Sequence, residues 1–183
     1  MQRINHILPK IVATLLVAFA VTAGADAADL TLFDGKTVAS IAYDGATPVA
    51  KAAALLAHDL GALSDKHATV KAGFVGMTGP AVIVGTADSP MIAALLKANN
   101  IDAGPIAGKW ETYGRAAIPA PWNSKQQVLL IFGSDTRGTI WGVIDLTREM
   151  GVSAWEWWAD VKIRRVGRIA VDGALHYSKE PSV

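Results

Sequence analysis

The chain has 183 residues, no cysteine, and a formal net charge of +1 from 17 basic and 16 acidic side chains. A charge so close to zero provides no strongly basic face, so we expect no nucleic-acid partner. The absence of cysteine excludes a disulfide scaffold. The chain is long enough to form one domain that is stabilised by its own hydrophobic core.

The first 27 residues have the three regions of a secretory signal peptide in the usual order. Arg3 and Lys10 are positively charged, residues 11–21 are apolar, and residues 25–27 read Ala-Asp-Ala, with residues 23–25 as an alternative cleavage site. The apolar region is too short to span a bilayer comfortably. We therefore expect export to a bacterial periplasm or beyond, with no membrane segment after cleavage.

The first part of the mature chain contains two strand patterns and one helix pattern. Residues 30–33 and 40–43 are short apolar segments joined by turn residues, which suggests an antiparallel hairpin. Residues 47–64 start with Thr-Pro and continue with alanine and leucine at helical spacing, which predicts a helix. Residues 69–72 indicate a weaker strand.

The middle of the chain contains a clear buried strand at residues 81–85. A second helix is expected to begin with Ser89 as its N-cap and Pro90 as its first residue. Residues 109–117 alternate enough to predict an exposed strand or hairpin arm. Residues 119–123 are predicted to form an irregular loop.

A third strand-to-helix passage follows. Residues 128–132 are continuously apolar, and residues 133–136 read Gly-Ser-Asp-Thr, a turn rich in helix-capping residues. An amphipathic helix then runs to a stop at Gly151. Residues 82–88 show the same order of apolar strand, glycine, hydroxyl residue and acid before a helix. This repetition predicts two parallel strands whose helices begin at the same edge of the sheet.

The C-terminal part adds one predicted strand at residues 161–171 and a polar tail from His176 that resembles a linker. The expected fold class is α/β: a single small domain with a mixed β-sheet and about three helices packed on it. The expected boundaries are 1–27 for the signal peptide, 28–175 for the domain and 176–183 for the linker.

The turn before the third helix has two interpretations. Backbone N–H groups at the helix start, together with Ser134 and Arg137, could bind a phosphate or a uronate carboxylate. However, the turn matches no phosphate-loop or dinucleotide-binding pattern. We favour a capped turn in which Ser134, Asp135 and Arg137 anchor the loop.

A cluster of tryptophans follows Gly151. Its candidate functional residues are Trp155, Glu156, Trp157, Trp158 and Asp160. The indoles could stack on the apolar faces of sugar rings while the acids accept hydrogen bonds from hydroxyl groups. Alternatively, they fill the core or contact a neighbouring domain, and we favour that interpretation because each indole buries a large apolar area.

The sequence predicts no catalytic residue, no cofactor and no metal site. Glu111, Glu149 and Glu156 are candidate carboxylates, together with several aspartates, but the sequence cannot pair them as glycoside hydrolysis requires. His58 and His67 have no metal-binding spacing, and no serine has the context of a hydrolase nucleophile.

Residues 133–142 (GSDTRGTIWG) and 151–161 (GVSAWEWWADV) together resemble the N-terminal domain of glycoside hydrolase family 115, the xylan α-1,2-glucuronidases. In that family a catalytic barrel follows this domain, and residues 179–183 lie about where the barrel should begin. The resemblance implies a fragment of such an enzyme, or an isolated accessory domain, without catalytic residues. Its expected partners are the barrel and glucuronoxylan-derived oligosaccharides. Two alternatives stay open: a free-standing carbohydrate-binding module, and a structural domain that docks a partner through an apolar patch.

Overall fold

The computed structural model describes residues 29–158 and 161–181. The predicted signal peptide and Asp160 lie outside these residues, as do the side chains of Trp157 and Trp158. Within the described residues, no helix has both the length and the apolar character needed to cross a membrane.

A six-stranded mixed sheet forms the centre of the fold, in the order β3-β2-β4-β6-β5-β8. The first four strands in this order are parallel, whereas β5 is antiparallel to both β6 and β8. The strands are β2 (Ser40–Asp44), β3 (Val70–Ala72), β4 (Ala81–Thr86), β5 (Tyr113–Ala120), β6 (Asn123–Gly133) and β8 (His176–Tyr177).

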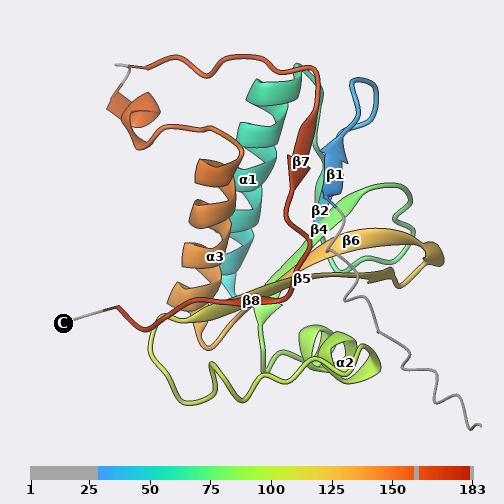
Figure 1. Cartoon of the computed structure of the whole chain (residues 1–183), viewed down its shortest axis with the longest axis vertical. Helices are drawn as coiled ribbons and strands as arrows, with labels where there is room; N and C mark the ends of the chain where they lie inside the picture. Colours follow the sequence, from blue (N-terminus) through green and yellow to red (C-terminus); the bar gives the residue numbers. More distant parts are fainter. Residues whose placement is uncertain (1–28, 159–160, 182–183) are drawn as a thin grey trace, which may run out of the picture.

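Helices cover both faces of this sheet, as Figure 1 shows: α1 and α3 lie side by side on one face and α2 lies on the other. The helices are α1 (Thr47–Ser64), α2 (Pro90–Ala98) and α3 (Thr136–Glu149). Each sheet face has its own core. Leu56, Leu60 and Val143 belong to the core under α1 and α3, whereas Ile92 and Phe132 belong to the core under α2. The predicted α/β class with a mixed sheet and three helices is confirmed.

The predicted parallel pair is also confirmed. β4 and β6 are neighbours in parallel register, with Val84 opposite Ile131. β4 and the second half of β6, residues 128–133, are buried on their two faces, as expected for continuous apolar runs in a parallel sheet. The following helices, α2 and α3, therefore both begin beyond the carboxyl edge of the sheet.

The predicted N-terminal hairpin is wrong. β1 (Leu30–Phe33) pairs with β7 (Ile169–Val171) in a separate two-stranded sheet. β2 has β3 on one side and β4 on the other, so neither of its edges is open to β1. A single antiparallel bridge between Phe33 and Val38 is the remnant of the expected pairing.

Three further predictions need correction. β5 begins at Tyr113 and is largely buried between β6 and β8 rather than exposed. The strand expected over residues 161–171 is confined to β7. His176 and Tyr177, expected in a linker, form β8 at the end of the sheet, because their backbone pairs with Gly114 and Arg115.

Candidate functional site

The turn between β6 and α3 is fixed by side-chain hydrogen bonds to the segment that precedes β5. The carboxylate of Asp135 accepts from the backbone N–H of Gly138 at 2.6 Å and from that of Glu111 at 3.0 Å. The hydroxyl of Ser134 accepts from the N–H of Thr112 at 3.1 Å and donates to its carbonyl at 3.0 Å. Asp135 thus caps α3 and joins it to the start of β5.

Glu111 is the centre of this arrangement. It is 9% exposed and has a left-handed backbone, with φ of 54°. Its carboxylate lies 2.9 Å from the Arg137 guanidinium and accepts a 3.0 Å hydrogen bond from Nε1 of Trp141. A non-glycine residue in this conformation persists only where its surroundings hold it. Here Arg137 and Trp141, from the first two turns of α3, hold the side chain, and Asp135 accepts from the backbone N–H.

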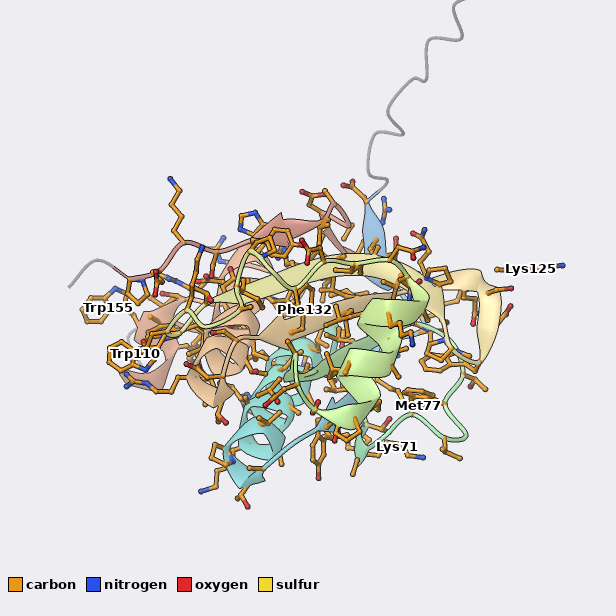
Figure 2. All side chains as sticks on the ribbon, turned by 90° about the horizontal axis from the view of Figure 1, so that it is seen from below. Lys71, Met77, Trp110, Lys125, Phe132 and Trp155 are labelled. Carbon is orange, nitrogen blue, oxygen red and sulfur yellow. The ribbon has the colours of Figure 1, made fainter. Side chains whose placement is uncertain are left out.

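Two tryptophans flank this ion pair. The guanidinium of Arg137 lies 5.4 Å from the centre of the Trp110 ring, within cation–π range. Trp110 is 58% exposed and Trp141 is 42% exposed. In Figure 2, Trp110 projects from the edge of the molecule, whereas Phe132 lies in the interior. The site therefore presents indoles to solvent around a buried carboxylate.

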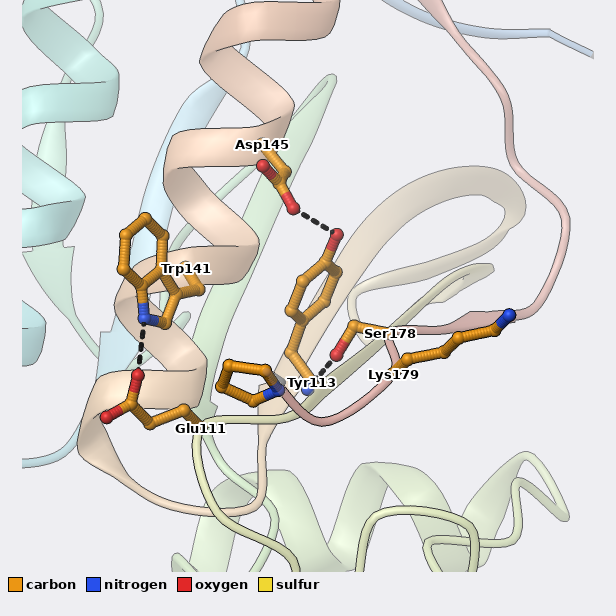
Figure 3. Close-up of a pocket in the computed structure, with 7 residues that line it drawn as sticks. Glu111, Tyr113, Trp141, Asp145, Ser178 and Lys179 are labelled. Atoms are coloured by element: carbon orange, nitrogen blue, oxygen red, sulfur yellow. Dashed lines mark hydrogen bonds between the residues drawn. The ribbon is translucent and has the colours of Figure 1, made fainter. Parts of the chain in front are cut away.

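A hollow of about 180 Å³ opens beside Trp141, and Figure 3 shows the side chains that line it. The Tyr113 hydroxyl donates a 2.8 Å hydrogen bond to Asp145, and the Ser178 hydroxyl accepts from the Tyr113 N–H at 2.9 Å. Burial, and then the hydrogen bond to Asp145, raise the pKa of Tyr113 well above its ordinary range, so this hydroxyl stays protonated. Lys179 extends away from Trp141 in Figure 3, so its ammonium group does not face the carboxylates.

A second hollow of about 300 Å³ lies between α1 and α3, on the other side of Trp141. Leu55 and Asp59 of α1 line it together with Ile144 of α3 and Ser153 beyond it. Asp59 is buried and bonded to Nδ1 of the neighbouring His58 at 3.2 Å. Burial raises the pKa of Asp59, and the bond to His58 opposes this shift.

The tryptophan cluster lies in a short 3₁₀ helix, η1 (Ala154–Trp158), rather than in an extended segment. Trp155 is 62% exposed, and Figure 2 shows its ring at the surface. Glu156 is half-buried and close enough to Asp59 to contribute to the raised pKa of that carboxyl. Among the predicted residues in the described part of the chain, Ser134, Asp135 and Arg137 come together at the turn before α3. Trp155 instead lies beyond α3, where its backbone N–H donates to the Ser153 hydroxyl.

Glu149 is engaged elsewhere, beside β5 and the segment after β7. Glu149 pairs with Arg115 and accepts a 3.3 Å hydrogen bond from the Asp172 N–H. In the part of the chain that the structure describes, no group of three or more metal-ligating side chains comes together. Sequence reasoning missed Tyr113, at the start of β5, and Trp141 and Asp145, on α3. Nothing in the sequence around them distinguishes them from ordinary core or surface residues.

The fold and the site define a small α/β domain with aromatic and acidic side chains gathered at the α3 side of the sheet. No protein-family model and no curated protein sequence matches the chain. Among solved structures, the chain is similar to a family GH115 4-O-methyl-α-glucuronidase with specificity for decorated arabinogalactans. The match has 26% identity and a TM-score of 0.61, and it covers 82% of this chain but only 18% of that protein. The chain is thus a glycoside hydrolase-related domain with a GH115-related fold.

Proposed function

We propose that this chain is the N-terminal, non-catalytic domain of an exported α-1,2-(4-O-methyl)glucuronidase whose catalytic barrel follows it. The observation that carries the proposal is the structural match, which covers most of this chain and less than a fifth of the glucuronidase. Such a share fits one accessory domain of a much longer enzyme. The domain would support the barrel and form one wall near the sugar site.

The carboxylates of the site support a non-catalytic role. Retaining and inverting glycosidases need two carboxyl groups on opposite sides of the scissile bond, about 5–10 Å apart, and one of them must reach the anomeric carbon or a water. Glu111 is buried against Arg137 and Trp141, and Asp145 is bonded to Tyr113. Both carboxylates are engaged in contacts that hold the fold together, which supports the proposal that the chemistry lies in another domain.

The expected substrate is a plant polysaccharide that carries 4-O-methylglucuronic acid. The sequence motifs favour glucuronoxylan, whereas the structural neighbour is specific for decorated arabinogalactans. Release of 4-O-methylglucuronic acid from both polysaccharides by the purified chain is the test. We expect no release from either, and measurable turnover would show that the chemistry lies in this domain after all.

Export is part of the proposal and rests on residues 1–27, which lie outside the described part of the chain. Expression in a Gram-negative host and N-terminal sequencing of the periplasmic product test it. We expect a mature protein that begins at Ala28, or at Asp26 if the alternative site is used. An uncleaved cytoplasmic product would contradict export.

A free-standing carbohydrate-binding module is the second candidate, and the exposed ring of Trp155 favours it. In that case the platform would be η1 itself. Titration with aldouronic oligosaccharides, repeated with Trp155→Ala, tests this candidate. Binding that depends on Trp155 would support it over the accessory-domain role, whereas no effect of the substitution would remove η1 as the platform.

A further inference from the structure

We propose that the two hollows on either side of Trp141 form one binding groove for a neutral oligosaccharide, with the Trp141 indole as its stacking platform. Trp141 lines both hollows, so a ligand with several sugar rings can occupy both and cross the indole between them. This inference rests on the proposed function for its ligand class, and it moves sugar contact from η1 to α3.

The first argument is that the orientation of Trp141 is fixed before any ligand arrives. Its Nε1 donates to Glu111, and Glu111 is in turn held by Arg137 and, through its backbone N–H, by Asp135. Yet 42% of Trp141 stays exposed. An exposed ring that is locked in place loses little conformational entropy on binding, which is the property that a stacking platform needs.

The second argument is the set of polar groups around that ring. The first hollow offers the partly exposed carboxylate of Asp145 as an acceptor and the Ser178 hydroxyl, which already accepts from Tyr113 and keeps its own proton to donate. Sugar hydroxyl groups both donate and accept, so they complement such a set. The second hollow adds apolar walls and the buried carboxylate of Asp59.

The charges of the groove select against uronic acids. Asp145 and Glu111 line one hollow and Asp59 lines the other, whereas the ammonium group of Lys179 points away. Arg148, which lines the second hollow, lies 3.4 Å from Asp145, and Arg137 lies 2.9 Å from Glu111, so both of these cations are already paired and offset the two carboxylates of the first hollow. A uronate carboxylate would have to compete for these paired arginines and, in the second hollow, would lie near the Asp59 carboxyl, which disfavours its binding. The groove thus fits the neutral backbone of a decorated polysaccharide rather than its glucuronic acid side group.

Isothermal titration of the purified chain with xylohexaose, a galactan hexasaccharide and an aldouronic acid tests the inference. We expect at least one neutral hexasaccharide to bind with a dissociation constant of about 0.1–1 mM and the acidic sugar to bind about tenfold more weakly. Trp141→Ala should weaken neutral-sugar binding by at least about tenfold. Trp141→Phe keeps a ring but loses the bond to Glu111, so its affinity for the neutral sugar should lie between those of the unsubstituted protein and Trp141→Ala.

Val75→Ala is the control, because it removes an exposed apolar side chain outside both hollows, and it should leave the affinity unchanged. Far-ultraviolet circular dichroism of each variant checks that it is folded. No saturable binding of either neutral sugar up to about 10 mM would overturn the inference and leave the groove as a contact face for another domain. Unchanged affinity in Trp141→Ala, or tighter binding of the acidic sugar, would also overturn it. None of these results bears on uronic acid release by a longer gene product. The proposed function is therefore tested independently of this groove.

Discussion

Trp141 on α3 donates a 3.0 Å hydrogen bond from Nε1 to Glu111, which lies in the segment leading into β5. This bond joins two parts of the chain that are separated by the whole of β5 and β6 (Figure 3). It makes the exposed indole depend on a buried carboxylate. Substitutions on either side of the bond should therefore affect both the stability of the domain and the shape of its groove.

Replacing Glu111 should destabilise the domain, and alanine should destabilise it more than glutamine. Glu111→Ala removes the acceptor for Trp141 and the partner of Arg137, and we expect a loss of about 2 kcal/mol in the free energy of unfolding. Glu111→Gln keeps an acceptor for Trp141 but loses the charge, so about 1 kcal/mol is expected. Urea unfolding at neutral pH measures both. Equal stability of Glu111→Ala and the unsubstituted protein would show that the cluster contributes nothing to folding.

Gly138 should tolerate no side chain. A Cβ at this position would lie 2.1 Å from the carbonyl oxygen of Thr112, which is backbone and cannot move aside. We expect Gly138→Ala to cost more than about 3 kcal/mol or to prevent folding. Gly167→Ala is the control, because a Cβ there meets open space. In thermal unfolding, Gly138→Ala should melt at a much lower temperature than Gly167→Ala. Similar melting temperatures would contradict the close approach of α3 to the segment before β5.

Asp135 and Ser89 occupy the same capping position on different helices but should differ in importance. Asp135 accepts from the N–H of Gly138 and also from that of Glu111, whereas the Ser89 side chain makes no cap hydrogen bond to α2. We expect Asp135→Ala to lower the free energy of unfolding by about 1–2 kcal/mol and Ser89→Ala by clearly less. Urea unfolding of both variants checks the order, and a larger effect at Ser89 would contradict the hydrogen bonds described here.

Asp59 should make stability fall as the pH rises. Burial raises the pKa of this carboxyl above its ordinary value of 3.8, so the folded state holds the proton more tightly than the unfolded state does. The contribution of Asp59 to stability is therefore greatest below about pH 4 and is lost as the pH rises through the raised pKa of the folded state. Asp59→Asn should remove this slope and be more stable than the unsubstituted protein at neutral pH.

Urea unfolding across a pH series measures the effect of Asp59. His58 and Glu156 are the charged neighbours that act on the same carboxyl, so His58→Gln serves as the control for the imidazole. That variant should keep the falling slope, because burial, the larger cause, remains. An identical pH dependence in Asp59→Asn and the unsubstituted protein would show that Asp59 titrates as an ordinary carboxyl.

The central part of the fold was predictable because its sequence signals are local. Continuous apolar runs at residues 82–84 and 128–132, each followed by a turn and an amphipathic helix, predict parallel buried strands with crossover helices. The N-terminal pairing was not predictable in this way. Proximity along the chain favours a hairpin, but β2 is occupied on both edges by distant strands, and only the tertiary fold decides that β1 joins β7.

The candidate site was predicted only in part, for a related reason. The capping pattern at Ser134 and Asp135 is visible in the sequence. The partners of those residues, and the left-handed backbone of Glu111, depend on contacts across 22 to 30 positions of the chain. Trp141 has no sequence signal that separates a platform from a core residue, because its role follows from the bond to Glu111 and from its exposure.

The central claim is that this domain precedes a catalytic barrel, and the coding sequence beyond Val183 tests it most directly. We expect an open reading frame of barrel length. A protein expressed from the extended frame should release 4-O-methylglucuronic acid from a glucuronic acid-bearing polysaccharide, under conditions where the 183-residue chain releases none. A stop codon directly after Val183, or an extended product of barrel length without any such activity, would contradict the account.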